Sequence, residues 1–115
     1  MLTRAIGSSR SESAATAVQS CLGTARSFTS TESVPARWPA SGSVTATSNC
    51  NDINVKPTIG DDVRTCFLPS SGGTTCNGWR PIAGGTWGLA ATDVKDGTKF
   101  YVQFRYGWEY GSIAY

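Results

Sequence analysis

The sequence predicts an all-β protein, namely a single antiparallel β-sandwich of immunoglobulin-like architecture with two disulfides and a flexible N-terminal tail. From Cys21 onward, short runs of β-branched and aromatic residues are separated by Gly, Pro, Asn and Asp clusters roughly every ten residues, as in sandwiches and barrels. Residues 99 to 106, KFYVQFRY, alternate apolar and polar side chains, which is typical of a half-buried strand. Four cysteines without a C-x-x-C pair indicate structural disulfides.

The chain divides into two parts by composition. Residues 1 to 20 are rich in Ser, Ala and Thr and contain few large apolar side chains, which predicts a flexible extension. A partner-docking arm is the alternative interpretation of this segment. Residues 21 to 115 are expected to form one disulfide-stapled domain, since a chain of 115 residues is sufficient for a single core.

The strands are expected in order along this domain. The apolar runs predict them over residues 25–30, 43–48, 52–56, 63–68, 78–82, 86–92, 99–106 and 111–115. The dipeptide Asp96-Gly97 suits a tight turn, so we expect the last run before it and the first run after it to pair as a central antiparallel hairpin. The alternation places Trp87, Phe100 and Phe104 in the core.

The cysteines are Cys21, Cys50, Cys66 and Cys76, for which three pairings are possible. A bond between Cys66 and Cys76 would tie the turn-rich segment FLPSSGGTT, and Cys21 would then pair with Cys50. Disulfides persist in oxidising compartments, so a secreted, extracellular location is expected, although no signal peptide is visible at the written start. No apolar run approaches the length of a membrane span, so membrane insertion is not expected.

Composition argues against several function classes. Ten Lys and Arg against eight Asp and Glu leave a net charge of +2, and the cations are scattered, which is unlike a nucleic-acid interface. The chain contains no histidine, which excludes Ser-His-Asp and Cys-His hydrolases. We expect no enzyme activity, no catalytic residues, no metal and no cofactor.

Aromatic residues supply the candidate binding site. Once the core rings are assigned, the site residues that we expect are Trp79, Tyr101, Arg105, Trp108 and Tyr110. Trp, Tyr and Arg are enriched at protein interfaces, and exposed indoles also stack on sugar faces. Glycines flank the segment that contains Trp108 and Tyr110, so this pair is expected to be displayed. Trp79 could instead cover an end of the sandwich.

Polar clusters offer weaker candidates. Two converging carboxylates could serve a glycosidase, and three oxygen ligands could begin a calcium site. The turn contexts of Asp61, Asp62 and Asp96 favour backbone capping instead. The amides around Cys50, in NCNDIN, could bind a sugar or peptide, but local hydrogen bonding is the commoner use of such residues.

A resemblance to known proteins rests on six segments, namely CLGTARSF, WPASG, TSNCNDINVKP, VRTCFLPSSGGTTCNGWR, GTWGLAATDVKDGTKFYVQF and GSIAY. Over residues 21 to 115 the chain resembles a group of small secreted, disulfide-bonded actinomycete β-domain proteins that bring no established activity. It is also similar to the small adaptor subunits of actinomycete umbrella toxin particles, which join a lectin subunit to a toxin subunit. This likeness implies an exported adaptor whose N-terminal extension enters a partner.

These observations together predict a secreted, non-catalytic adaptor that binds a secreted or cell-surface protein. One alternative is a carbohydrate-binding module that holds cell-wall or environmental polysaccharide through Trp108, Tyr110 and Tyr101. Another is a protease inhibitor whose contact loop, LPSSGGTT, is tied by Cys66 and Cys76.

Overall fold

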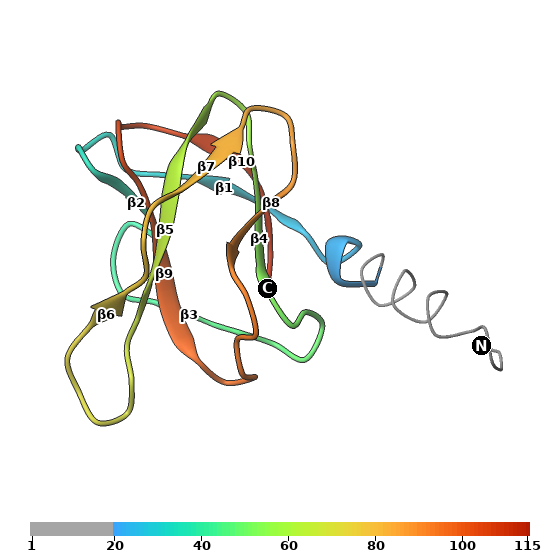
Figure 1. The fold of residues 1–115 in the computed structure, drawn as a ribbon, viewed down its shortest axis with the longest axis vertical. Coiled ribbons are helices and arrows are strands. Elements are labelled where there is room, and N and C mark those ends of the chain that lie inside the picture. The colour runs from blue at the N-terminus through green and yellow to red at the C-terminus, as the bar shows by residue number, and fades with distance from the viewer. Residues whose placement is uncertain (1–19) are drawn as a thin grey trace, which may run out of the picture.

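The computed structural model describes residues 20 to 115, and their strands form two antiparallel sheets (Figure 1). The four-stranded sheet has the order β1 (Arg26–Thr29), β10 (Tyr110–Ala114), β4 (Ile53–Pro57) and β8 (Gly88–Ala91). The six-stranded sheet has the order β2 (Ala36–Trp38), β9 (Lys99–Phe104), β5 (Gly60–Phe67) and β6 (Thr75–Cys76), with β3 (Val44–Thr45) beside β9 and β7 (Arg80–Ala83) beside β5. The all-β prediction is confirmed, and the immunoglobulin-like arrangement stays a prediction. Apart from Ser20, the expected extension lies outside the described residues.

The core lies between the two sheets. Phe28 of the four-stranded sheet stacks on Phe104 of the six-stranded sheet, with ring centroids 5.2 Å apart. Phe100 meets Tyr115 edge to face at 5.3 Å. Such aromatic pairs add stability beyond the area that they bury. Phe100 and Phe104 are fully buried, which confirms their predicted place in the core.

Strand β9 shows the alternation expected from its sequence. Phe100, Val102 and Phe104 are fully buried, while Tyr101 and Gln103 are partly exposed on the other face. β9 pairs with β2 on one side and with β5 on the other, which makes it a central strand of the six-stranded sheet.

Two disulfides fasten the domain. Cys66 and Cys76 lie opposite each other on β5 and β6, and their bond closes the base of an exposed loop. Cys21 is bonded to Cys50, which ties the start of the domain to the segment before β4. The sequence left three pairings open, and the structure has the one in which Cys66 ties the turn-rich segment to Cys76.

The expected hairpin between β8 and β9 is wrong, because the two strands belong to different sheets. The connecting segment crosses from one sheet to the other, and its backbone bonds to the segment before β4. The N–H of Gly97 donates to the carbonyl of Ala46, and the N–H of Val94 donates to the carbonyl of Asn51, both at 2.8 Å. Gly97 has a φ of 87°, so the turn occurs where expected while the strand pairing does not.

Trp87 is also misplaced by the sequence pattern. Its ring is partly exposed and packs on a small separate cluster formed by Cys21, Cys50 and Ala114, not between the sheets. The ring lies outside the core because Gly88, which abuts the side chain of Ile82, and Ala90 occupy the inward positions, and this alternation turns Trp87 and Leu89 to the other side. The short strands β2 and β6 were not expected, since runs of three and two residues carry too little pattern to recognise.

Candidate functional site

The outward face of the six-stranded sheet gathers arginine and aromatic side chains. Because the inward positions of β9 fill the core, Tyr101 and Gln103 point outward, with Arg105 directly after the strand. Arg37 on β2 and Arg64 on β5 both lie opposite Gln103 in the strand register. We call this surface the arginine–aromatic face, which comprises Arg37, Arg64, Trp79, Tyr101, Gln103 and Arg105.

Each arginine of this face lies over an aromatic ring. The guanidinium carbon of Arg37 is 3.8 Å from the ring centre of Tyr101, and that of Arg64 is 4.4 Å from the ring centre of Trp79. Arg105 lies 5.8 Å from the ring centre of Trp79 and 5.3 Å from that of Tyr106. These cation–π contacts hold the long side chains in place along the sheet.

Hydrogen bonds further restrict two of these arginines. Arg64 donates from Nε to Oε1 of Gln103 at 2.7 Å. Arg37 donates from Nε to the carbonyl of Pro39 at 2.9 Å and from Nη2 to the carbonyl of Gly42. The face therefore presents guanidinium groups whose positions are set before any partner binds.

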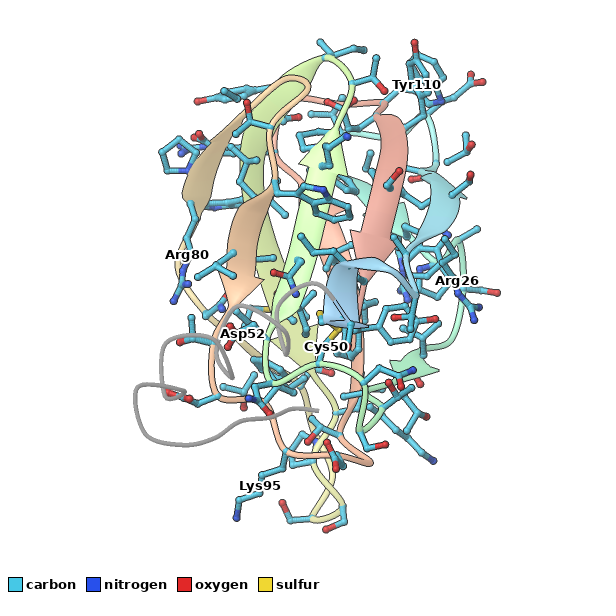
Figure 2. All side chains as sticks on the ribbon, turned by 90° about the vertical axis from the view of Figure 1, so that its right-hand side faces the viewer. Arg26, Cys50, Asp52, Arg80, Lys95 and Tyr110 are labelled. Atoms are coloured by element: carbon cyan, nitrogen blue, oxygen red, sulfur yellow. A yellow bond between two sulfur atoms is a disulfide. The ribbon has the colours of Figure 1, made fainter. Side chains whose placement is uncertain are left out.

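Trp108 and Tyr110 form a different surface feature. Their rings stack on each other with centroids 4.9 Å apart, and they are 44% and 40% exposed. Tyr110 lies on β10 opposite Thr29, at the upper end of the four-stranded sheet (Figure 2). The pair is displayed, as its glycine-flanked sequence predicts.

The structure thus divides the five residues expected to form one site. It brings Trp79, Tyr101 and Arg105 together on the six-stranded sheet, while Trp108 and Tyr110 accompany the four-stranded sheet. Sequence analysis missed Arg37, Arg64 and Gln103, which complete the arginine–aromatic face.

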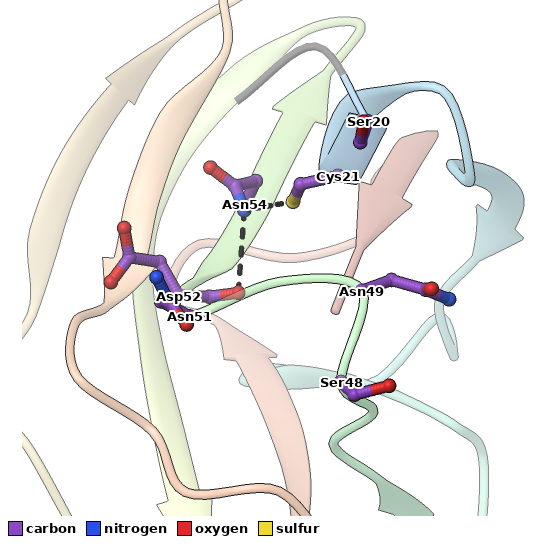
Figure 3. Close-up of a pocket in the computed structure, with 7 residues that line it drawn as sticks. All are labelled: Ser20, Cys21, Ser48, Asn49, Asn51, Asp52 and Asn54. Atoms are coloured by element: carbon purple, nitrogen blue, oxygen red, sulfur yellow. Dashed lines mark hydrogen bonds between the residues drawn. The ribbon is translucent and has the colours of Figure 1, made fainter. Parts of the chain in front are cut away.

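A polar pocket of about 360 Å³ lies beside the Cys21–Cys50 disulfide, and it includes the amides expected from the sequence (Figure 3). The lining residues are Ser20, Cys21, Ser48, Asn49, Asn51, Asp52 and Asn54. The amide nitrogen of Asn54 donates to Cys21 Sγ at 3.3 Å and to the carbonyl of Asp52 at 3.3 Å. Oδ1 of Asp52 accepts the backbone N–H of Asp93 at 2.9 Å. Asn54 and Asp52 are therefore used in structural hydrogen bonds. Only the bond between these two residues is local, as expected, whereas the bonds to Cys21 and Asp93 reach distant parts of the chain.

The carboxylates lie at opposite ends of β4. Before the strand, the Asp52 carboxylate accepts the backbone N–H of Asp93, whereas Asp61 and Asp62 follow the turn after the strand, near Glu109. Burial raises the pKa of Asp61 above its usual value, and the nearby charges of Glu109 and Asp62 act in the same direction. The backbone N–H groups of Tyr106 and Asp62 donate to this carboxylate and oppose the shift. Asp52 and Asp93 are thus separated from Asp61, Asp62 and Glu109 by the length of β4, so these acids do not converge in one cleft.

Glu109 serves as a buried backbone clamp. Its side chain is 1% exposed, and its oxygens accept the backbone N–H groups of Ile59 and Gly60, each at 2.9 Å. It also accepts the N–H of Tyr110 at 3.1 Å. This residue holds the β4–β5 turn against β10, and its segment GWEYG gave no sign of burial.

The disulfide-tied loop is exposed, as the inhibitor alternative requires. It borders a groove of about 830 Å³ that residues 95 to 99 complete. The N–H of Gly72 donates to the carbonyl of Pro69 at 2.9 Å, and Gly72 and Gly73 have φ values of 98° and 79°. The loop is therefore a compact turn, not an extended segment that could add to a protease cleft in strand form.

No family model matches this chain, and neither a curated protein nor a solved structure shows significant similarity to it. The likeness to secreted actinomycete proteins therefore stays a prediction. The two disulfides are consistent with an extracellular location. Within residues 20 to 115, no helix has the length and apolar character to cross a membrane, and no three acidic, Cys or His side chains group as a metal site.

Proposed function

We propose that this protein is a secreted, non-catalytic binding domain that contacts a protein partner through the arginine–aromatic face. The observation that carries the proposal is the stacking of Arg64 on Trp79 and of Arg37 on Tyr101 across one sheet surface. Trp, Tyr and Arg are enriched at protein interfaces, and here the stacking already restricts both arginine side chains before a partner binds. In a secreted assembly, such as the toxin particles that the resemblance implies, the domain would act as an adaptor.

The absence of catalytic function is part of this proposal. The chain contains no histidine, and the acids that could replace it are separated or bonded to backbone N–H groups. A buried carboxylate whose oxygens already accept several hydrogen bonds is poorly placed to exchange a proton with a substrate.

Capture of partners from the culture supernatant of the producing organism tests the proposal. The immobilised protein should retain a discrete secreted protein, and Trp79→Ala should reduce its recovery at least fivefold. Trp108→Ala is the matched control, because it removes an indole from the other sheet and should leave recovery unchanged. Equal recovery by wild type and Trp79→Ala would contradict the proposal.

A carbohydrate-binding module is the second candidate, and the stacked, exposed Trp108–Tyr110 pair favours it. One face of each ring is covered by the other ring, so a sugar would stack on an outer ring face. This function predicts that the protein sediments with insoluble cell-wall glycan and that Trp108→Ala abolishes sedimentation while Trp79→Ala does not. Failure to sediment with cell-wall and environmental polysaccharides alike would remove this candidate.

A further inference from the structure

The arginine–aromatic face also indicates the chemistry of its partner. We propose that this face selects a protein surface that presents carboxylates, and that Arg64 makes the central contact with them. The inference rests on the proposed function, since it names the partner class for the same surface.

The charge of the face is strongly unbalanced. It contains three guanidinium groups, from Arg37, Arg64 and Arg105. Asp62 forms an ion pair with Arg105, with Nη1 and Oδ2 separated by 3.4 Å. A surface with this excess of positive charge attracts partners of opposite charge and repels others.

Arg64 is the arginine best prepared to receive a carboxylate. Gln103 occupies its Nε, and Trp79 supports one face of its guanidinium plane. Among the described residues, no acceptor bonds its two Nη groups. These groups remain as a planar fork that matches the two oxygens of a carboxylate, and the side chain is already restricted before binding.

Arg37 has a different role on the same face. Two backbone carbonyls take N–H groups of its guanidinium, and Tyr101 lies under the plane. Arg37 and Arg64 flank Gln103 on either side of β9, so their backbones are two strand spacings apart, or about 10 Å. Arg37 thus adds positive potential beside the fork of Arg64 while offering fewer free donors.

The half-buried rings strengthen this recognition. Trp79 and Tyr101 flank the arginines and would exclude water from a bound carboxylate. Ion pairs are stronger where water is partly excluded, and arginine is less strongly hydrated than lysine. The arrangement therefore favours direct contacts between these arginines and individual Asp or Glu side chains, in addition to the general attraction between opposite net charges.

Fluorescence anisotropy of a labelled hexaglutamate peptide tests the inference directly. Binding should be measurable at about 0.01 M ionic strength, where the Debye length is about 30 Å, and should weaken as salt is added. Arg64→Gln should weaken binding at least tenfold. Arg64→Lys should also weaken it severalfold, because the ammonium keeps the charge but loses the planar fork.

Arg80→Gln provides the matched control, because Arg80 pairs with the inward-facing Val63 and donates from Nη1 to the carbonyl of Leu89 on the other sheet, so the substitution removes one positive charge that does not belong to this face. Its affinity for hexaglutamate should remain within twofold of wild type. The inference is overturned if Arg80→Gln weakens binding as much as Arg64→Gln, or if Arg64→Gln has no effect. It is also overturned if oligogalacturonate or polyphosphate binds more tightly than hexaglutamate, since the face would then recognise another anion. The urea midpoints of all variants establish that each one is folded.

The two proposals fail in different ways. In one outcome, Trp79→Ala loses the secreted partner but Arg64→Gln does not change hexaglutamate binding. The proposed function would then stand, and the selectivity for carboxylates would be overturned. In the other outcome, Arg64→Gln weakens hexaglutamate binding but Trp79→Ala does not reduce capture of the partner. The selectivity for carboxylates would then be supported, and the proposed function would be contradicted.

Discussion

Glu109 offers the sharpest test of how the fold is held. Replacement by Gln keeps the shape of the side chain but replaces one acceptor oxygen with an amide group that faces a backbone N–H. One of the bonds to Ile59 and Gly60 must then be lost, and the remaining bonds lose the contribution of the charge. A hydrogen bond to a charged group contributes about 1.5–3 kcal/mol, so we predict that Glu109→Gln lowers the free energy of unfolding by about 2–4 kcal/mol.

Urea unfolding followed by tryptophan fluorescence, with both disulfides intact, measures this change. The slope for small domains is about 1–3 kcal/mol per molar urea, and at a slope of about 2 kcal/mol per molar the midpoint should fall by about 1–2 M. Glu32→Gln is the matched control, because Glu32 is exposed and the same substitution there should change stability by less than about 0.5 kcal/mol. Coincident midpoints for the two variants would refute the view that Glu109 is a clamp.

Two further predictions concern charge and covalent links. The pKa of Asp61 in the folded state is raised above 3.8, so between the two pKa values the folded state binds more protons than the unfolded state. The contribution of Asp61 to stability is therefore lost as pH rises through the folded-state pKa. The stability of wild type relative to Asp61→Asn should therefore decrease from pH 3.8 upward in urea midpoints, and an increase would contradict the shift. For the disulfides, paired Cys→Ser replacement of Cys21–Cys50, which spans 29 residues, should cost about 3.6 kcal/mol, against about 2.7 kcal/mol for Cys66–Cys76, which spans 10. The reverse order of urea midpoints would show that loop entropy does not control these costs.

The sequence predicts the features of this fold that depend on local pattern. The alternation in β9 identified Phe100 and Phe104 as core residues, because side chains on successive strand positions must face opposite sides. Strand pairing does not follow from such patterns. Asp96-Gly97 forms a turn either in a hairpin or in a crossing between sheets, and the distant contact of Gly97 with Ala46 decides between them.

The candidate site was predictable only in part for the same reason. The exposed pair Trp108 and Tyr110 could be recognised from its glycine-flanked segment, which is a local signal. Arg64 lies within an ordinary strand run, and its importance comes from Gln103 and Trp79, which are brought to it by the register of β5 and β9 and by the loop before β7. Residue type alone does not reveal such a pairing.

The position of the chain's entry into the domain bears on the adaptor proposal. Cys21 and Leu22 pack with Trp87 beside the four-stranded sheet, so Ser20 lies on the side of the domain away from the six-stranded sheet (Figure 1). A partner bound on the arginine–aromatic face would therefore not cover the point where the preceding residues join the domain. Two partners could bind at once, one on the face and one through the extension, as an adaptor requires. Removal of residues 1 to 19 should then leave hexaglutamate binding unchanged, and a loss of that binding would show that the two sides are not independent.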